Sequence, residues 1–445
     1  MPRIHDLAIR EFGTRVRLFA QSPYIHGFAR PETVWLAPPA GSVGPGPADD
    51  RMYVIDPADH KEPYEFPYLP PYRGPVRPPV EPDEDGHFDY MDVNTRAFAI
   101  VHMYGGIRRV LDIWEGYFGR RIEWQFSRDF ERLELVPILD WDNAHSGYGF
   151  IETGFGPSQA GEAQAFCLNF DVLAHEIGHT IIFAEVGHHE ATVTGEYHGF
   201  QEAMGDLIAL ISALHFDSVL DRTLIASEGN LYVANEANRL GELSDVAQVR
   251  VASNARRLSE FEEGWSDPHF LAQPLVGAVF DCLVDVYQQH LLHAGLIDRD
   301  LVRLTNIVPY EELDEAAIQT RYAEAYHGRH EAFKDALIAA RDYLGNCLVY
   351  VMTGTSPHFL RYADVGATLL AADRHLSGGR FQDEFFDNLT WRDIGTAVVG
   401  PRLPEQESET GSHLSSGPEP ASGGDPMEQW RHTEGRLPTC PICCQ

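Results

Sequence analysis

The sequence predicts an α+β fold, and three observations along the chain support this class. Between residues 94 and 119, apolar side chains recur at intervals of three and four, the spacing of one face of a helix. Between 121 and 140 they alternate or run together, as they do in strands. Helical periodicity then dominates from 268 to 396. Strands are therefore expected in the first half of the chain and mainly helices in the second.

The remaining elements are predicted from the same patterns. A strand is expected within the first twenty residues, where Val16 and Leu18 alternate with Arg15 and Arg17. A loop rich in glycine and aromatic residues is expected at 142–156. Further helices are expected at 169–185, 197–215, 273–290 and 331–346.

Changes in composition divide the chain into four parts. Residues 1–92 form a proline-rich extension. Its stretch from about residue 22 to 85 cannot make regular helices or central strands, so it either wraps a neighbouring domain or acts as an extended arm. Residues 93–190 and 191–398 carry the periodic segments. Residues 399–445 are polar and rich in Gly, Pro, Ser and Glu, and we expect this tail to be disordered.

The composition is that of a globular protein with an unusually acidic surface. The 445 residues are 44% hydrophobic, enough for a sizeable core, and carry a formal net charge of −33. A surface this acidic repels phosphate backbones, so a nucleic-acid partner is not expected. No stretch approaches the roughly 18 uncharged apolar residues of a membrane span, so a membrane partner is not expected either.

The cysteines and the amino terminus indicate the compartment. Cys167, Cys282 and Cys347 are scattered singly, which is not the pattern of a disulfide framework. The first residues contain no apolar run of signal-peptide length. A cytoplasmic location is therefore expected, with export by a non-classical route as the alternative. The sequence does not indicate an oligomeric state.

The segment His175-Glu176-Ile177-Gly178-His179 is the first pattern that carries chemistry. On a helix, residues four apart share a face with Cβ atoms about 5–6 Å apart. Two imidazoles so placed can bind one zinc ion at about 2.0–2.1 Å each, and Glu176 can act as a base rather than a ligand. With 21 histidines, chance alone produces this pattern in roughly one such chain in twelve. Two ordinary histidines on an amphipathic helix therefore remain an alternative.

A second expected helix offers the third metal ligand. Glu202 and Asp206 stand four residues apart beside an apolar stripe, and uncompensated buried charge is costly. A metal ion and an imidazole would compensate it. We therefore predict that Glu202 binds the metal and that Asp206 accepts a hydrogen bond from a ligating histidine. A solvated acidic edge is the alternative.

A third segment, Gly264-Trp265-Ser266-Asp267-Pro268-His269, leads into another expected helix. Hydrolysis of a peptide bond needs a group that stabilises the developing oxyanion. A protonated imidazole at a helix entrance, kept charged by Asp267 or a nearby glutamate, suits that role, so we predict it for His269. An ordinary surface histidine is an equally weighted alternative from these residues alone.

These segments together resemble the thermolysin-like and fungalysin-like zinc metallopeptidases, the gluzincin group. The resemblance covers about residues 94–396, and its matching stretches are 171–179, 201–206, 268–269 with 277–283, and 367–379. It implies a two-lobed fold with zinc in the cleft. The β-containing amino-terminal lobe would be 93–190 and the mainly helical carboxyl-terminal lobe 191–398.

The resemblance also implies roles for individual residues. Gln201 matches a hydrogen-bond partner of His179, and Asn143 and Ala144 match an edge segment that pairs with the substrate backbone. Tyr197 or His198 could replace a tyrosine that assists the oxyanion. The roles already argued are those implied too: His175, His179 and Glu202 as zinc ligands, Glu176 as base, Asp206 as partner of a ligand, and His269 at the transition state.

Structural calcium is not predicted. Some members of the group bind calcium, and Asp171 matches one of the ligand positions. Ala213, however, stands where a second acidic ligand is expected. The predicted cofactor is therefore one catalytic zinc ion.

The predicted function is a zinc-dependent endopeptidase that hydrolyses a peptide or protein substrate through a zinc-bound water activated by Glu176. A catalytically inactive scaffold of the same fold is one alternative, and a zinc exopeptidase is another. The cluster Cys440, Cys443 and Cys444 has the spacing of half a zinc knuckle, but no second Cys or His pair lies nearby, so it is given no role.

Overall fold

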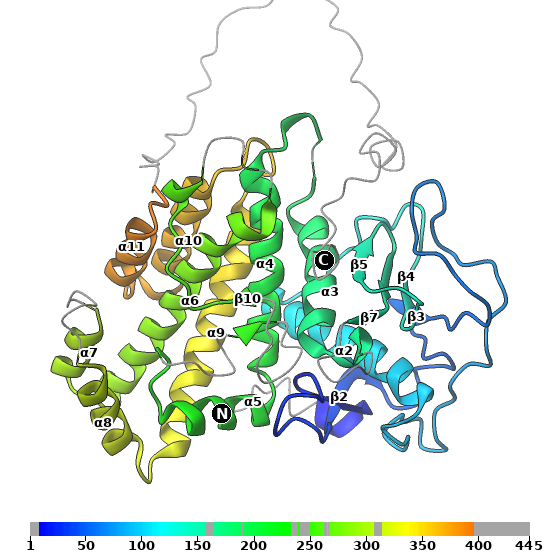
Figure 1. The fold of residues 1–445 in the computed structure, drawn as a ribbon, viewed down its shortest axis with the longest axis horizontal. Helices are drawn as coiled ribbons and strands as arrows, with labels where there is room; N and C mark the ends of the chain where they lie inside the picture. The colour runs from blue at the N-terminus through cyan, green and yellow to red at the C-terminus, as the bar shows by residue number, and fades with distance from the viewer. Residues whose placement is uncertain are drawn as a thin grey trace, which may run out of the picture.

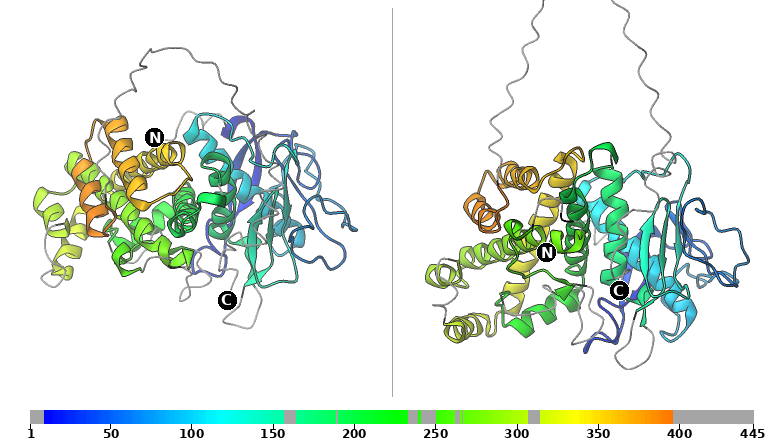
Figure 2. Two further views of the ribbon diagram at one scale, coloured as in Figure 1. Left: turned by 90° about the horizontal axis from the view of Figure 1, so that it is seen from above. Right: turned by 45° about the horizontal axis from the view of Figure 1, so that its top comes forward.

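The computed structural model describes residues 9–156, 164–188, 190–232, 239–240, 250–261, 265, 267–306 and 314–395. Its fold is mixed α+β, as predicted: most of the strands gather on one side and most of the long helices on the other, with the short strand at 250–251 among the helices (Figure 1). Both views of Figure 2 show the same separation. The expected tail 399–445, with its cysteine cluster, lies outside the described residues. The two-lobed thermolysin-like division and the four-part boundaries stay predictions.

The elements have the following bounds. The strands are β1 (Gly13–Leu18), β2 (Glu32–Pro39), β3 (Met52–Val54), β4 (Leu133–Val136), β5 (Ala144–Gly147), β6 (Phe150–Thr153), β7 (Phe155–Gly156), β8 (Gln164–Ala165), β9 (Arg239–Leu240) and β10 (Arg250–Val251). The α-helices are α2 (Arg96–Phe118), α3 (Phe170–Glu185), α4 (Gly195–Ala213), α5 (Asp217–Ser227), α6 (Pro268–His293), α7 (Arg299–Asn306), α8 (Glu315–Tyr326), α9 (His330–Gly354), α10 (Tyr362–Ser377) and α11 (Gln382–Trp391). Short 3₁₀ helices are η1 (Phe166–Leu168), η2 (Glu190–Thr192) and η4 (Leu258–Glu260).

The largest sheet has the strand order β3-β4-β6-β5. β4 pairs in parallel with β3 and β6, whereas β5 runs antiparallel to β6 and forms an edge. The prediction of a loop at 142–156 is therefore wrong, because this segment contains a hairpin. Its strands are joined through Tyr148 and Gly149, and Gly149 adopts a φ of +88° that glycine tolerates without steric cost.

The strand expected from residue 121 onward begins only at Leu133. Ile122, Trp124 and Phe126 alternate in the sequence, but they lie in turns and irregular backbone. All three are buried, and the rings of Trp124 and Phe126 stack with centroids 5.6 Å apart. Their spacing therefore reflects packing of side chains rather than a pleated backbone.

The proline-rich segment packs on one face of the large sheet. Val136 and Phe150 on that face form a small core with Tyr64, against which Leu69 and Tyr72 also pack. The opposite face carries the side chains that join the main hydrophobic core with α2 and α3: Leu133, Leu135 and Ile151. We call residues 55–72 the strap, because they cover the sheet from outside. The proline-rich segment was expected either to wrap a neighbouring domain or to extend as an arm. Within it, the strap packs against the large sheet and does not extend away from it.

The predicted helices are confirmed, with small differences at their ends. α2 occupies 96–118 where 94–119 was expected, and α3 and α4 begin within two residues of their predicted starts. The amino-terminal cap of α3 is Asn169, whose side chain accepts hydrogen bonds from the amides of Asp171 and Val172. Asp171 accepts a 3.0 Å hydrogen bond from Nε2 of Gln21, so it ties the start of α3 to the segment after β1.

Within the described residues, α6 is the helix long and apolar enough to cross a membrane, and α4 with α5 would be another if a pair bent by 93° counted as one span. In the apolar window of α6, 83% of the residues are buried inside the protein. Such burial is what the central helix of a globular core requires, so packing accounts for the apolar character of α6.

Candidate metal centre

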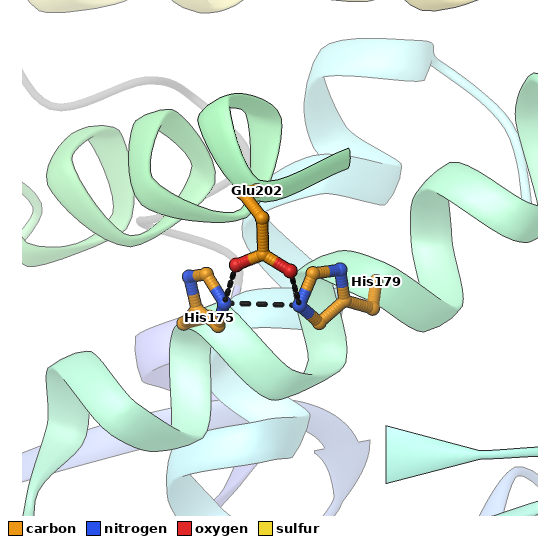
Figure 3. Close-up of side chains that lie close together, drawn as sticks. All are labelled: His175, His179 and Glu202. Atoms are coloured by element: carbon orange, nitrogen blue, oxygen red, sulfur yellow. Dashed lines mark hydrogen bonds and ion pairs between the residues drawn. The ribbon is translucent and has the colours of Figure 1, made fainter. Parts of the chain in front are cut away.

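His175 and His179 on α3 and Glu202 on α4 meet between the two helices, as Figure 3 shows. Nε2 of His179 lies 2.9 Å from Nε2 of His175. The Glu202 carboxylate spans the pair, with one oxygen 3.3 Å from His175 and the other 3.7 Å from His179. All three side chains are buried. The structure thus brings together the three residues that the sequence predicts as metal ligands.

These distances suit a single metal ion. A tetrahedral zinc ion with bonds of about 2.0–2.1 Å holds its ligand atoms about 3.3 Å apart. The three observed separations lie on both sides of that value. Two neutral imidazoles and a carboxylate are also a donor set that zinc accepts readily. The residues present therefore fit one divalent ion.

Two glycines allow α3 and α4 to approach closely enough for this arrangement. A Cβ atom on Gly178 of α3 would lie 3.2 Å from the Cα of Gly205 on α4. A Cβ atom on Gly205 would lie 2.8 Å from the ring of His175. Sequence reasoning missed this role. The available signal was the position of both glycines inside helices, where glycine costs about 1 kcal/mol relative to alanine and therefore needs a reason.

Asp206 orients His175. Its Oδ1 lies 3.0 Å from Nδ1 of His175, and both side chains are buried. A carboxylate in this position accepts the Nδ1 proton, so the lone pair of the neutral ring resides on Nε2, which faces Glu202 and His179. The placement agrees with the predicted contact between Asp206 and a ligating histidine.

Glu202 is held in its charged form. Burial alone would raise the pKa of this carboxyl, but the imidazoles of His179, His175 and His269 together keep the pKa well below its usual value. A buried carboxylate between imidazoles gives the site a local negative charge that favours a cation.

Glu176 follows His175 directly on α3 and is fully buried. Within the described part of the chain, neither of its carboxylate oxygens has a hydrogen-bond partner. An unpaired buried carboxylate costs several kcal/mol, so native proteins keep one only where something else engages it. A base that acts on a reactant at the metal is one such case.

His269 approaches from the start of α6. Its Nε2 lies 3.1 Å from Oε2 of Glu202, and its Nδ1 lies 3.4 Å from Oδ1 of Asp267. Asp267 also caps α6, since its side chain accepts hydrogen bonds from the amides of His269 and Phe270. One carboxylate therefore contacts both the backbone and the ring of His269, whose predicted role at the transition state stays a prediction.

Tyr197 and Gln201 form a contact of their own on α4. The Tyr197 hydroxyl donates to the carbonyl of Gly187 at 2.8 Å and accepts from Nε2 of Gln201 at 2.8 Å. The hydroxyl hydrogen is thus committed to Gly187, and the predicted contact of Tyr197 with substrate requires that bond to open. The predicted pairing of Gln201 with His179 stays a prediction. His198 is partly buried, and burial lowers its pKa while Glu202 opposes the shift.

Asn143 and Ala144 lie at the start of edge strand β5, which packs against α3 (Figure 1). The amide of Gly154 donates to the carbonyl of Asn143 at 2.7 Å, so the backbone groups of residue 143 face β6. Because backbone groups alternate in direction along a strand, those of Ala144 and Ser146 are directed to the outer edge. The amide of Ala144 donates to Oδ1 of Asn143 at 2.5 Å, so its pairing with a substrate requires that bond to open. That orientation is what pairing with a substrate backbone requires, and such pairing stays a prediction.

Comparisons with known proteins leave the family of the chain open. No protein-family profile matches the sequence, and no curated protein sequence matches it. Among solved structures, the fold is similar to the precursor of protealysin, a metalloproteinase from Serratia proteamaculans. The identity is 12%, the TM-score is 0.41, and the match covers 81% of this chain and 92% of the other. Similarity at this level does not establish a family.

Proposed function

We propose that the protein is a zinc-dependent endopeptidase. One observation carries this proposal: His175, His179 and Glu202 converge in the protein interior, and Glu176, the residue after His175 on α3, is buried with no hydrogen-bond partner for its carboxylate among the described residues. The spacing of the two histidines, with a glutamate next to the first, is the pattern of a metal site in which the glutamate serves as general base.

The ligand residues and Asp206 prepare the site. His175, His179 and Glu202 would hold the ion, and Asp206 keeps His175 in the tautomer that leaves Nε2 available. When bound, zinc supplies Lewis acidity and lowers the pKa of a bound water. Burial of all three ligands excludes bulk water and strengthens the electrostatic interactions within the site.

Glu176 and His269 would handle the protons and the charge of the reaction. Glu176 accepts a proton from the attacking water and later donates it to the leaving amine. His269 donates from Nε2 to the oxyanion that forms at the scissile carbonyl. Oδ1 of Asp267, at 3.4 Å from Nδ1, would hold the ring in the orientation that this donation needs.

The edge of β5 supports a polypeptide as substrate. Ala144 and Ser146 direct backbone groups outward beside α3, and an extended peptide can add to such an edge as a further strand. A chain that pairs with a strand edge can continue past it in both directions. This feature favours cleavage within a chain over removal of a terminal residue.

Zinc content and casein cleavage, measured for the wild type and for Glu176→Gln, test the proposal. We expect about one zinc per chain in both proteins and a loss of activity of at least about 100-fold in the variant, because the base is removed and the ligands remain. Glu185→Gln on the same helix is the matched control, since the nearly buried carboxylate of Glu185 pairs with the half-exposed guanidinium of Arg120. It should keep wild-type activity.

Two results would contradict the proposal. A Glu176→Gln protein with full activity would remove Glu176 from the mechanism. A wild-type protein that binds zinc but cleaves no member of a peptide library at any pH where it is folded would instead support a binding scaffold.

A further inference from the structure

Two buried carboxylates lie on the face of the sheet that the strap covers. Glu134 on β4 and Glu152 on β6 are both fully buried, an unfavourable position for a charge without partners. Glu134 accepts hydrogen bonds from the hydroxyl of Tyr53 at 2.6 Å, from the hydroxyl of Tyr64, and from the amide of Tyr72 at 3.0 Å. Two of these donors belong to the strap.

The carboxylate of Glu152 has partners on both the strap and the edge strand β5. Oε1 pairs with the ammonium group of Lys61, which is only 7% exposed. Oε2 accepts from the amide of Tyr64 at 2.7 Å and lies 3.0 Å from Nε2 of His145. The Lys61 ammonium also lies 3.4 Å from the centre of the Tyr64 ring. Lys61, Glu152 and His145 thus form a continuous chain of charged and polar groups, which we call the clamp.

His145 connects the clamp to β5. It stands directly opposite Glu152 in the β5–β6 ladder. Its ring also packs against Trp141 and Phe150, with centroids 4.8 and 5.1 Å away. β5 has four residues and pairs only with β6 among the described strands, and so short an edge strand opens easily unless its side chains hold it. The contacts of His145 with Glu152, Trp141 and Phe150 stabilise β5 from the face opposite α3.

We infer that Lys61, Glu152 and His145 are positioning residues that fix β5 so that its outer edge can pair with an extended polypeptide. The strap thereby gains a role: it supplies Lys61 and the Tyr64 amide and holds the substrate-binding edge against the sheet. This inference rests on the proposed function, because it concerns binding of the same substrate. It involves no residue that contacts the metal.

The variant His145→Phe tests the clamp with the least disturbance. Phenylalanine retains ring contacts with Trp141 and Phe150 but cannot donate to Glu152. Loss of a hydrogen bond to a charged group should raise KM for a long peptide about tenfold. We expect kcat to change by less than about twofold and zinc per chain to stay the same, the pattern of lost substrate binding.

Two further variants separate positioning from general damage. His145→Gln retains a side-chain donor and should restore KM to within about threefold of the wild-type value, as expected when the hydrogen bond is remade. His60→Phe removes a histidine–glutamate contact of the strap that lies at the surface, and it should leave KM unchanged. If His145→Phe does not fold, the double variant Lys61→Met/Glu152→Gln removes both charges together without leaving one unpaired, and it should show the same rise in KM.

Amide hydrogen exchange gives a readout that does not depend on activity. In His145→Phe, the amides of residues 145 and 147, which face β6, should exchange at least about tenfold faster, while those of α3 should be unchanged. Unchanged exchange in β5, or an unchanged KM in an active protein, would overturn the inference. Absence of cleavage by the wild type would contradict the proposed function instead, and the exchange measurement would still decide whether the clamp holds β5.

Discussion

A Cβ atom built on Gly205 would lie 2.8 Å from Nδ1 of His175, the nitrogen that contacts Asp206. The ring of His175 therefore occupies the space that any larger residue at position 205 would fill. Because the ring cannot move without leaving the metal group, the geometry of the site depends on a residue that has no chemistry of its own.

We predict that Gly205→Ala weakens metal binding. The added methyl group must displace either the ring of His175 or the crossing of α3 and α4, and overpacking of this kind costs about 1–3 kcal/mol. We expect the affinity for zinc, measured by competition with a chelator, to fall by at least about tenfold. Gly395→Ala is the control, since a Cβ there meets nothing within 4 Å. Equal zinc affinity in the two variants would refute the packing argument.

Asp206→Asn should also weaken metal binding, but by a different route. The fold has room for the amide, yet the neutral side chain no longer favours a proton on Nδ1 of His175 at 3.0 Å. Removal of such a partner typically lowers metal affinity by about 10–100-fold. The exposed Asp300 on α7 offers a charge-matched control, Asp300→Asn. If both variants release zinc at the same chelator concentration, Asp206 does not orient the ligand.

Much of the site could be predicted from the sequence because its residues lie at fixed intervals on helices. His175 and His179 share a helix face by spacing alone, and Glu202 with Asp206 repeats that interval on the next helix. The crossing of those helices could not be predicted in the same way. It depends on Gly178 and Gly205, whose contact is a property of the packed pair and leaves no periodic signal in either helix.

The strands were less predictable for a related reason. Alternation of apolar and polar residues indicates which side chains are buried, but it does not show that the backbone is a strand. Trp124 and Phe126 alternate with polar residues and are buried although they lie in irregular backbone and a turn. The β5–β6 hairpin was missed because its glycines suggest a loop. The pairing of Lys61 with Glu152 joins residues 91 positions apart, so only the folded chain reveals it.

His102 should make the stability of the protein fall in mild acid. The ring is fully buried, with Nε2 accepting from the amide of Phe19 at 2.9 Å and Nδ1 donating to the carbonyl of Cys167 at 2.8 Å. Burial lowers its pKa to about 4. Since the unfolded chain takes up a proton near pH 6.5 and the folded one does not, this contribution to stability is complete above that pH and is lost progressively toward pH 4.

Urea unfolding at two pH values measures the effect. Between pH 7.5 and pH 5, the contribution of His102 to the free energy of unfolding should fall by about 2 kcal/mol. The variant His102→Gln lacks the titrating ring, so its stability should depend less on pH by that amount. An equal pH dependence in both proteins would show that the folded protein also protonates His102.

Asp285 should have the opposite pH dependence. This carboxyl on α6 is buried, and burial raises its pKa to about 7, although the amide of Asn388 at 2.7 Å and the hydroxyl of Tyr232 at 3.2 Å both donate to it. The unfolded chain releases this proton near pH 3.8, whereas the folded chain retains it up to about pH 7. The protonated acid therefore favours folding at low pH, and the contribution is lost as the pH rises from 3.8 toward 7.

Removing the charge should therefore stabilise the protein at alkaline pH. We expect Asp285→Asn to raise the free energy of unfolding at pH 8 by about 1–3 kcal/mol. The variant avoids the cost of burying a charge, and the loss from a weakened hydrogen bond offsets part of this gain. At pH 4 the wild-type carboxyl is protonated in the folded protein, so most of the advantage of the variant should disappear there. Asp300→Asn again serves as the surface control and should shift neither value. A variant that is less stable than the wild type at pH 8 would mean that Asp285 is held as an anion by partners strong enough to offset its burial.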